Sequence, residues 1–466
     1  MDFVNRYVEL TDLRRVLGNP RPSLIRVYGR RRSGKTELLR KLCREADGVY
    51  LLVDEADALQ QRASLSAQLA QQSRSPSIPY PSWDAFYDHL LVVRRKFVVL
   101  DEFQRLLTSD PVAISRLQQY WDTRFKESGP SLILCGSSIG MMQRLTQQRA
   151  APLFGRLTAD LRIRPFGYAA TRLLYPEEAE EERIRRYAVF GGTPFYHEFS
   201  LGRSLEDAVQ EAFLRPTSPL VEEPQNLLRL ELQSPLRHNS ILYEIGQGTH
   251  SLPELETKVG VQKGGLGPYL HTLRSDMDLV GMEDPVCGIQ KHARYVLADP
   301  FFQFYYRFIF ENRPKLELGR GRAVWSEIER QLDSFVGFAF ERVAREALTL
   351  LNGTSRGDVA IDFDQIGRWW SRQGEEIDIV AAGEDEVLAG EVSWSRHPMG
   401  PGELGKLEGK VAQIERLGNR PVRLLLVSRS GFTDGVEAEA DRRGGLLLTL
   451  QDLVRVFEER YRPSRA

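Results

Sequence analysis

The chain has 466 residues, of which 42% are hydrophobic and 27% charged, and its formal net charge is -1. This length is enough for roughly three domains with a sizeable core. The near-zero charge excludes a global basic field that would draw the whole protein onto nucleic acid, so any such binding must depend on a local patch.

The cysteines and the apolar runs of the chain indicate in which cellular compartment the protein is expected. The cysteines, Cys43, Cys135 and Cys287, are scattered, which indicates a reducing compartment without a disulfide framework. The histidines never pair with cysteines at zinc spacing, so no structural zinc is expected. No apolar run approaches the roughly 18 residues that would span a bilayer, and the first residues contain no apolar signal core. We therefore expect a cytoplasmic protein with no membrane partner.

The first motif is a phosphate-binding loop. An apolar strand is predicted over residues 24–28, followed by G-x-x-x-x-G-K-T at 29–36 and an amphipathic helix, and this is the context that such a loop requires. Backbone N–H groups of the loop would cradle phosphates at the helix N-terminus. Lys35 would reach the β- and γ-phosphates of ATP, and the hydroxyl of Thr36 would bind Mg²⁺. The predicted contacts with the nucleotide come from Gly29, Arg30, Arg31, Arg32, Ser33, Gly34, Lys35, Thr36 and Glu37.

A second motif agrees with the first. The stretch "RRKFVVLDEF" predicts a buried strand that ends in Asp101 and Glu102. Asp101 would hold Mg²⁺, directly or through water, and Glu102 would polarise the attacking water. Another apolar run, "VYLLVD" at 49–54, lies between the two motifs and implies an extra strand between their strands. The adjacent glutamate and the extra strand favour the ATP-hydrolysing branch over a GTPase or kinase branch.

Two further segments extend this domain. "SLILCGSSIGMM" predicts a strand that ends in Ser137 and Ser138, which would sense the γ-phosphate or simply cap the strand end. Arg156 precedes a final predicted strand at 161–164. It would neutralise charge on the phosphates during transfer, or it is an ordinary surface arginine.

Several of these pieces together resemble one family. "FVNRYVELTDLRRVL", "VYGRRRSGKTELL", "VVLDEF", "LILCGSS", "LFGRLT" and "FGGTPFY" are similar to segments of the archaeal-type AAA ATPases of the STAND superclass. The first piece resembles the opening box of that family, which usually carries Gly-Arg where Asn5 and Arg6 stand here. Since that box packs against adenine in related ATPases, the resemblance implies that Arg6 contacts the nucleotide. The resemblance also implies a helical lid, with the turn at 191–196 beside the nucleotide.

The middle of the chain predicts a winged helix after the lid. From residue 234 to 299 the pattern is three helices and then two short strands. The second helix has Ser251 as a predicted cap with Glu254 three residues later, the spacing of a capping box. The third helix would be the DNA-reading helix and would expose Lys263, His271 and Arg274. Because it holds two glycines, one proline and few basic residues, the alternative is a purely structural arm.

The last third of the chain predicts a hairpin with two carboxylates. From about residue 323 the predicted order is helix, strand, strand, helix, strand, helix, which matches a restriction-endonuclease-like core and resembles the C-terminal domain commonly fused to these ATPases. Asp378 and Glu391 lie on the paired strands, where two carboxylates could share a Mg²⁺ ion. Glu341 on the preceding helix could add a third.

A lysine usually accompanies such carboxylates, but Ser393 occupies its position here. Only ten of the 63 basic residues are lysines, and two of them, Lys406 and Lys410, lie on the next predicted helix. Lys410 is the better substitute, because Lys406 sits in the first turn. Retained nuclease chemistry, a degenerate domain that binds nucleic acid or protein, and a plain structural hairpin all remain open.

The predicted chain is thus α/β, with a P-loop ATPase core at 1–168, a helical lid at 169–233, a winged helix at 234–310 and a restriction-endonuclease-like domain at 323–466. The first functional hypothesis is a STAND-type ATPase switch that uses ATP and Mg²⁺ and controls the C-terminal domain. The alternatives are an ATP-regulated, metal-dependent DNA nuclease and a scaffold that holds nucleotide without turnover. DNA, through the winged helix and C-terminal domain, a protein partner and self-association are the expected partners besides ATP.

Overall fold

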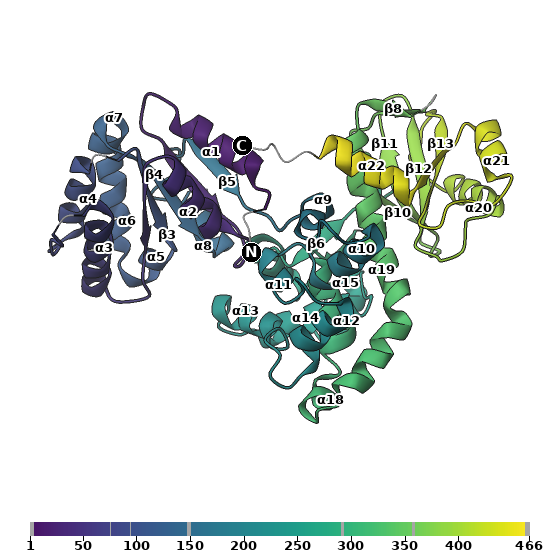
Figure 1. Ribbon diagram of the computed structural model, residues 1–466, viewed down its shortest axis with the longest axis horizontal. Helices are drawn as coiled ribbons and strands as arrows, with labels where there is room; N and C mark the ends of the chain where they lie inside the picture. Colours follow the sequence, from purple (N-terminus) through teal and green to yellow (C-terminus); the bar gives the residue numbers. More distant parts are fainter. Residues whose placement is uncertain are drawn as a thin grey trace.

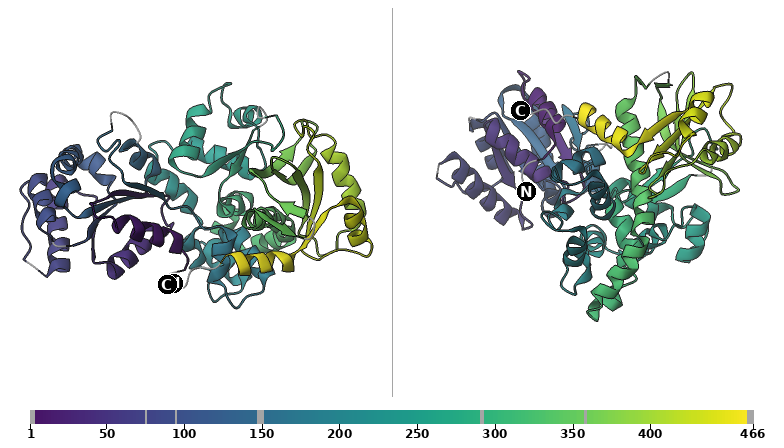
Figure 2. Two further views of the ribbon diagram at one scale, coloured as in Figure 1. Left: turned by 90° about the horizontal axis from the view of Figure 1, so that it is seen from above. Right: turned by 45° about the vertical axis from the view of Figure 1, so that its right-hand side comes forward.

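The chain forms an N-terminal α/β domain, a helical middle region and a C-terminal α/β domain, which follow one another across the molecule (Figures 1 and 2). The computed structural model describes residues 4–74, 76–93, 95–146, 151–289, 293–356 and 359–461. Within these ranges, no helix combines the length and apolar character needed to cross a membrane.

The N-terminal sheet is parallel throughout, in the order β2-β3-β4-β1-β5. Its strands are β1 (Leu24–Tyr28), β2 (Gly48–Leu52), β3 (Phe97–Asp101), β4 (Ser131–Gly136) and β5 (Ala159–Arg162). The run after the phosphate loop is confirmed as a strand, but its predicted place was wrong. β2 lies at the sheet edge, and β4 is the strand inserted between β1 and β3. Sequence order does not determine this insertion, because a parallel strand returns through a crossover connection.

Alternate side chains of the central strands supply two apolar cores. Ile25 of β1 packs with α1 (Tyr7–Leu17) and α2 (Lys35–Glu45) on one face of the sheet. Leu24 packs on the other face with α3 (Ala58–Ser73), α4 (Trp83–Val92) and α6 (Pro111–Tyr120). This is expected of a parallel sheet, which is covered on both faces and therefore built from continuous apolar strands. The shorter helices of this domain are α5 (Arg105–Ser109), α7 (Lys126–Ser128) and α8 (Ile139–Arg144).

The segment predicted as a lid is helical. It contains α9 (Tyr168–Thr171), α10 (Glu180–Phe190), α11 (Pro194–His197), α12 (Leu205–Val209) and α13 (Glu223–Glu231). The turn between α10 and α11 approaches the following region closely. A Cβ at Gly191, whose φ is 68°, would lie 1.7 Å from Oδ1 of Asp299, so only glycine fits there.

Three helices and an antiparallel hairpin follow, in the predicted order. They are α14 (Leu236–Gly246), α15 (Leu252–Val259), α16 (Gly267–His271), β6 (Val280–Glu283) and β7 (Arg294–Leu297). Part of the predicted second wing strand, residues 290–292, lies outside the described residues. Ser251 does precede α15, but its side chain makes no capping hydrogen bond, so the predicted capping box is wrong. Lys263 and His271 are exposed as expected, whereas Arg274 is half-buried.

One long helix joins the middle region to the C-terminal domain. After α17 (Pro300–Phe304) and α18 (Arg313–Glu317), α19 (Gly321–Leu351) runs for 31 residues along both parts (Figure 1). Its buried side chains belong to one apolar core that extends from Tyr168 in the lid to Phe457 near the chain end. The middle region and the C-terminal domain are therefore packed together through α19.

The C-terminal sheet is mixed, in the order β10-β11-β12-β13-β14. β10 (Gln365–Trp370), β11 (Glu376–Ala382) and β12 (Val387–Ser393) are antiparallel, and β13 (Val422–Ser428) and β14 (Leu446–Thr449) are parallel to β12. α20 (Gly402–Val411) and α21 (Val436–Arg443) cover one face, while α19 and α22 (Leu450–Arg460) cover the other. The predicted hairpin and helix order is present, but the prediction lacked β8 (Thr354–Arg356), β9 (Val359–Ile361), β10, α21 and β14.

Candidate nucleotide site and C-terminal carboxylate site

The phosphate loop connects β1 to α2, as its motif requires. Gly29 has a φ of 156°, and a Cβ on it would lie 2.1 Å from the carbonyl oxygen of Ile163. The loop can pass this close to the segment just after β5, which contains Ile163, only because Gly29 has no side chain. Gly34 then precedes the first residue of α2 in a left-handed conformation. The N-terminus of α2 is thereby presented to the loop, where its partial positive charge favours a phosphate.

Lys35 and Thr36 lie at the centre of the loop. The buried ammonium of Lys35 donates hydrogen bonds to the carbonyl oxygens of Gly29 at 2.7 Å and Arg30 at 2.9 Å. Burial lowers the pKa of Lys35. The hydroxyl of Thr36 donates to Oδ2 of Asp101 at 2.9 Å. A hydroxyl beside a carboxylate is an oxygen donor set of the kind that Mg²⁺ prefers, so these residues fit a magnesium ion.

Tyr50 is a neighbour of this pair that the sequence analysis missed. Its hydroxyl, on edge strand β2, donates to Oδ2 of Asp101 at 2.5 Å. Burial and the nearby carboxylate of Asp101 raise the pKa of Tyr50, so the hydroxyl stays protonated and remains a donor. Nothing in the local sequence singles out Tyr50. Only the pairing of β2 with β3 brings it to Asp101.

Glu102 is held by two polar side chains. Its Oε2 accepts hydrogen bonds from the hydroxyl of Ser137, at 2.8 Å, and from the amide of Gln104. Ser137 comes from the end of β4, the neighbouring strand, so the predicted sensor serine does lie beside the predicted catalytic carboxylate. Gln104 was not predicted, because its role depends on the sharp turn after β3. The arrangement orients a carboxylate at the open end of the sheet.

These residues open into a pocket of about 620 Å³ between the N-terminal domain and the lid. Lys35, Thr36, Glu102 and Ser137 line its floor. Its apolar wall is formed by side chains from the chain start, the segment before α9 and the lid, namely Val4, Phe166, Leu174, Phe195 and Leu227. A floor of charged groups and a wall of apolar groups suits a nucleotide, whose phosphates are charged and whose base is flat and apolar.

Arg6 lines the same pocket. It lies over the ring of Phe166 at 4.4 Å and donates to the carbonyl oxygens of Ser33 at 2.9 Å and Arg164 at 2.6 Å. Asn5 and Arg6 both have left-handed backbone angles, with φ of 62° and 66°. Asparagine tolerates this conformation better than most residues, so Asn5 can stand where the resembling family has glycine.

The three loop arginines direct their side chains to the lid and the region after it. Arg30 is buried and pairs with Thr193 at 2.6 Å and with Asp299 at 2.7 Å. Arg32 pairs with Glu223 of α13 at 2.6 Å. Arg31 approaches Glu231, also of α13, at 3.5 Å. The side chains of the loop arginines therefore attach the loop to the lid and to the region after it.

Two other residues predicted to contact the nucleotide lie away from the phosphate loop contacts described above. Glu37 lines the pocket and forms an exposed pair with Arg44 at 3.2 Å. Arg156 does not line the pocket and pairs bidentately with Asp122 at 2.9 and 2.7 Å. This geometry matches the surface interpretation of Arg156 rather than a phosphate contact.

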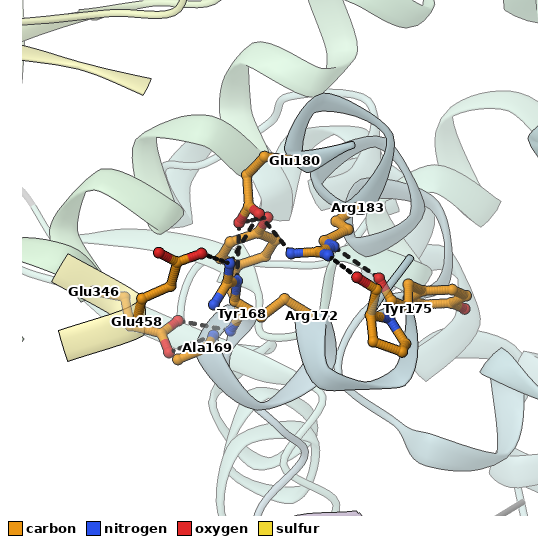
Figure 3. Close-up of polar contacts among 9 residues, drawn as sticks. Tyr168, Ala169, Arg172, Tyr175, Glu180, Arg183, Glu346 and Glu458 are labelled. Atoms are coloured by element: carbon orange, nitrogen blue, oxygen red, sulfur yellow. Dashed lines mark hydrogen bonds and ion pairs between the residues drawn. The ribbon is translucent and has the colours of Figure 1, made fainter. Parts of the chain in front are cut away.

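A carboxylate from the C-terminal half supports one wall of the pocket (Figure 3). Glu346 of α19 accepts hydrogen bonds from the backbone N–H groups of Tyr168, at 2.7 Å, and Ala169, at 3.0 Å. It thus caps the start of α9, two residues after the pocket residue Phe166. Arg172 binds Glu180 at 3.0 Å and approaches Glu458 of α22 at 3.7 Å. α19 and α22 therefore both contact the segment next to the nucleotide pocket.

Asp378 and Glu391 lie on the same face of the C-terminal sheet. Ile379 pairs with Gly390 in antiparallel register, so Asp378 and Glu391, one step further, stand opposite each other. Burial raises the pKa of both carboxyls, and the charge of Asp378 adds to this effect on Glu391. The ammonium of Lys410 on α20 donates to Glu391 at 2.8 Å. The lysine predicted to replace the missing one at Ser393 does reach this site.

Glu341 does not complete a metal site in this arrangement. Its carboxylate pairs with Arg368 of β10, and Arg345 lies 3.7 Å away. Among the described residues, no group of three or more His, Cys, Asp or Glu side chains is placed to hold a metal ion. The predicted third carboxylate therefore faces two guanidinium groups, and the site consists of two carboxylates and a lysine.

Comparisons with known proteins agree with the N-terminal geometry. Residues 3–196 match a family described as an ATPase domain predominantly from Archaea. Residues 305–404 match a family described as "Archaea bacterial proteins of unknown function". A relative in Methanocaldococcus jannaschii, Uncharacterized protein MJECL04, is 32% identical over 398 residues, which make up 84% of this chain and 87% of that protein.

Solved structures share less of the sequence. The Walker-type ATPase PABY2304 of Pyrococcus abyssi is 19% identical, and the match covers 66% of this chain and 96% of that one with a TM-score of 0.49. The ORC2 protein of Aeropyrum pernix is 16% identical, and the match covers 68% of this chain and 94% of that one with a TM-score of 0.44.

Proposed function

The chain belongs to the family of proteins that join an archaeal-type ATPase domain to a C-terminal domain of unknown function, and from this we propose that it is a regulatory ATPase. It binds ATP with Mg²⁺ in the pocket between the N-terminal domain and the lid, and it hydrolyses the γ-phosphate. The nucleotide state then alters how the C-terminal domain is held.

One observation carries the proposal. Phosphate-loop residues, the Thr36 hydroxyl that bonds to Asp101, and the oriented Glu102 converge on one pocket, although they come from different segments of the sheet and its connections. Lys35 would pair with the β- and γ-phosphates, while Thr36 and Asp101 would hold Mg²⁺. The metal would supply neutralisation of phosphate charge when bound. Glu102 is placed to take a proton from water.

The lid residues support closure over the nucleotide. Phe195 and Glu223, on two lid helices, line the same pocket as Lys35. Arg32 of the loop contacts both of them, since it pairs with Glu223 and lies 4.1 Å from the ring centre of Phe195. A phosphate that attracts Arg32 would compete with Glu223 for this guanidinium. Such competition is a physical route from nucleotide state to lid position, as expected of a STAND-type switch.

The experiment that tests the ATPase proposal compares the wild type with Lys35→Ala. ATP affinity is measured by titration, turnover by phosphate release, and folding by heat unfolding. We expect the variant to lose ATP binding, because the ammonium is the one lysine charge lining the pocket, while its unfolding temperature stays close to that of the wild type. Equal ATP binding and turnover in both proteins would contradict the proposal. Tight binding by the wild type without any turnover would favour the scaffold alternative.

A second candidate function, metal-dependent cleavage of DNA, has one specific observation in its favour. Lys410 reaches Glu391 opposite Asp378, so a lysine and two carboxylates meet on one sheet face. A cation would relieve the repulsion between the two carboxylates. This fits the restriction-endonuclease-like interpretation of the domain. In this proposal the three-helix and hairpin segment acts as a winged helix that would present DNA to the domain.

We expect weak binding of Mn²⁺ at this site and little cleavage by the wild type, since Ser393 cannot replace a lysine and Lys410 is already paired. Ser393→Lys should raise cleavage, and Asp378→Ala should abolish both metal binding and cleavage. The measurements are calorimetric titration with Mn²⁺ and a plasmid-nicking assay. Strong wild-type cleavage that survives Asp378→Ala would remove the site from consideration, whereas cleavage that Lys410→Ala abolishes would give the lysine role to α20.

A further inference from the structure

A second cavity, separate from the nucleotide pocket, lies between the middle region and the C-terminal domain. It has a volume of about 280 Å³. Its lining comes from the end of α14, the β6–β7 hairpin, the residues after α17, the middle of α19, and β10. Neither the ATPase proposal nor the carboxylate site uses it, because Asp378 and Glu391 do not line it.

Guanidinium groups dominate the charge of this cavity. Arg342, Arg345 and Arg368 line it, and Arg307 stands exposed at its rim. The opposing carboxylates are Glu283, in the lining, and Glu341, which pairs with Arg368. The carboxylate of Asp378, outside the lining, also interacts with Arg345 and Arg368. Four cations thus face three carboxylates, and the cavity carries an excess of positive charge.

Burial makes this excess costly. Burial and the neighbouring charge of Arg368 lower the pKa of Arg345 to about 10, and burial with neighbouring charge raises the pKa of Glu341 to about 7. Nε of Arg368 is buried without a hydrogen-bond partner among the described residues. Arg342 donates to the carbonyl oxygens of Leu297 and Ala298, and Arg345 donates to that of Asp378, so Nε of Arg368 is the donor that still lacks a partner. Burial of excess positive charge and of an unpaired donor is unfavourable, and an anion in the cavity would reduce both costs.

Part of the cavity lining is apolar. Phe308, Phe335 and Phe338 contribute to it, and Phe338 has 48% of its surface exposed. The volume is at the low end of the range of small-molecule sites, which is about 300–1,000 Å³. A ligand that fits must therefore be compact, with one anionic end for the arginines and one flat apolar end for the phenylalanines.

We propose that this cavity binds a small phosphorylated compound with a flat apolar body. A phosphate carries close to two negative charges and three acceptor oxygens, so it matches a cavity lined by several guanidinium groups better than a single carboxylate does. The compound contacts the hairpin, α19 and β10 at once. It therefore links the middle region to the C-terminal domain and acts as an effector of their arrangement.

The test is calorimetric titration of the full chain with three probes: phenyl phosphate, inorganic phosphate and a single-stranded oligonucleotide. The Lys35→Ala chain is used throughout, so that the phosphate loop does not contribute and the result does not depend on ATP hydrolysis. We expect phenyl phosphate to bind at one site per chain. Its affinity should exceed that of inorganic phosphate by about tenfold, because the ring buries apolar surface.

Added substitutions locate the site. Arg345→Gln should weaken phenyl phosphate binding by about tenfold or more, since a buried charge-assisted contact is lost. Arg307→Gln should weaken it by about threefold, because this cation is exposed and screened. Ser334→Trp should abolish binding, because Ser334 lines the cavity at an exposed position on α19 and the indole would fill the space. Arg330→Gln, an exposed arginine of α19 outside the lining, is the matched control and should bind like the parent.

Each remaining outcome overturns the proposal. Absence of phenyl phosphate binding does so, and so does binding that Ser334→Trp and Arg307→Gln leave unchanged. Oligonucleotide binding that these variants abolish, without phenyl phosphate binding, would assign the cavity to a nucleic-acid backbone instead. Heat unfolding checks that each variant folds. If Arg345→Gln does not fold, the two variants at exposed positions carry the test alone.

Discussion

Glu102 follows the last residue of β3 in a left-handed conformation, with a φ of 55°. This conformation is unfavourable for glutamate, so the surrounding contacts must maintain it. Ser137 and Gln104 both donate to the same oxygen, Oε2. Within the described part of the chain no hydrogen bond to the other oxygen, Oε1, is present, so a water molecule can donate to it. Glu102 is therefore oriented as a general base would be. This geometry predicts a specific effect of replacing Glu102 by the isosteric glutamine.

Replacement of Glu102 by Gln should leave ATP binding nearly unchanged but slow hydrolysis by about 10²- to 10⁴-fold, the usual contribution of a general base. The amide retains the shape of the side chain but cannot accept a proton. Single-turnover phosphate release and nucleotide titration measure the two effects separately. Asp54→Asn, a carboxylate at the end of the β2 segment that does not line the pocket, is a matched control and should hydrolyse ATP normally. Normal turnover in Glu102→Gln would move the catalytic base to another residue.

At the scale of elements, the lid helix α11 is anchored by a buried histidine. His197 makes two hydrogen bonds, one between Nδ1 and the hydroxyl of Tyr175 at 2.6 Å and one between Nε2 and the carbonyl oxygen of Gly191 at 2.8 Å. The neutral ring satisfies both if Nε2–H donates to the carbonyl and Nδ1 accepts from the tyrosine. Burial lowers the pKa of His197 to about 4. The lid therefore depends on a neutral imidazole beside the glycine turn.

This anchor predicts an acid-sensitive lid. Because the folded pKa is depressed below the ordinary value of 6.5, the contribution of His197 to stability is complete above pH 6.5 and is lost as the pH falls towards 4. The unfolded chain takes up a proton in this window and the folded chain does not. The free energy of unfolding should fall by about 3 kcal/mol across the window. Denaturant unfolding at pH 8, 6.5 and 5 measures the slope, and His197→Gln should flatten it. Identical slopes in both proteins would contradict this role of His197.

At the scale of the whole molecule, the nucleotide pocket and the C-terminal half share a structural element. α19 contributes Glu346 to the start of α9, and its neighbouring turns contribute Glu341 and Arg345 to the surroundings of the C-terminal carboxylates. Figure 1 shows how this one helix runs from the middle region to the C-terminal sheet, and Figure 3 shows Glu346 at the start of α9. A packed helix rather than a flexible linker therefore connects the two sites.

Removal of the Glu346 carboxylate, which caps the start of α9, tests whether α19 couples the two sites. Glu346→Ala leaves the N–H groups of Tyr168 and Ala169 without their acceptor, which should cost about 1–2 kcal/mol of stability. Since Phe166 lies two residues away, ATP affinity should weaken as well, by about three- to tenfold. Titration with ATP and heat unfolding are the measurements. The matched control is Glu458→Ala, which removes a more exposed carboxylate of the same junction, 3.7 Å from Arg172, and should change neither quantity appreciably. A loss of stability with unchanged ATP affinity would make Glu346 a structural cap only.

The motifs and strands that depend only on residues close together in the chain could be predicted from the sequence. The phosphate loop, the strand that ends in Asp101 and Glu102, and the strand that ends in Ser137 were predicted, because each is a local pattern of apolar runs and short motifs. The paired strands with Asp378 and Glu391 were predicted on the same ground. Lys410 was also singled out in advance, because a rare lysine stood on the next helix where a basic group was missing.

The contacts between side chains that are far apart in the sequence could be found only from the tertiary structure. The position of β4 between β1 and β3, the contact of Tyr50 with Asp101, and the pairing of Arg30 with Asp299 all follow from strand order and helix packing, which no short window of sequence encodes. Glu341 is the clearest case, since sequence spacing made it a metal-ligand candidate and the position of Arg368 on β10 made it half of an ion pair. Long-range pairing has this effect because the partner of a buried charge is set by the packing of the whole chain and not by its own segment.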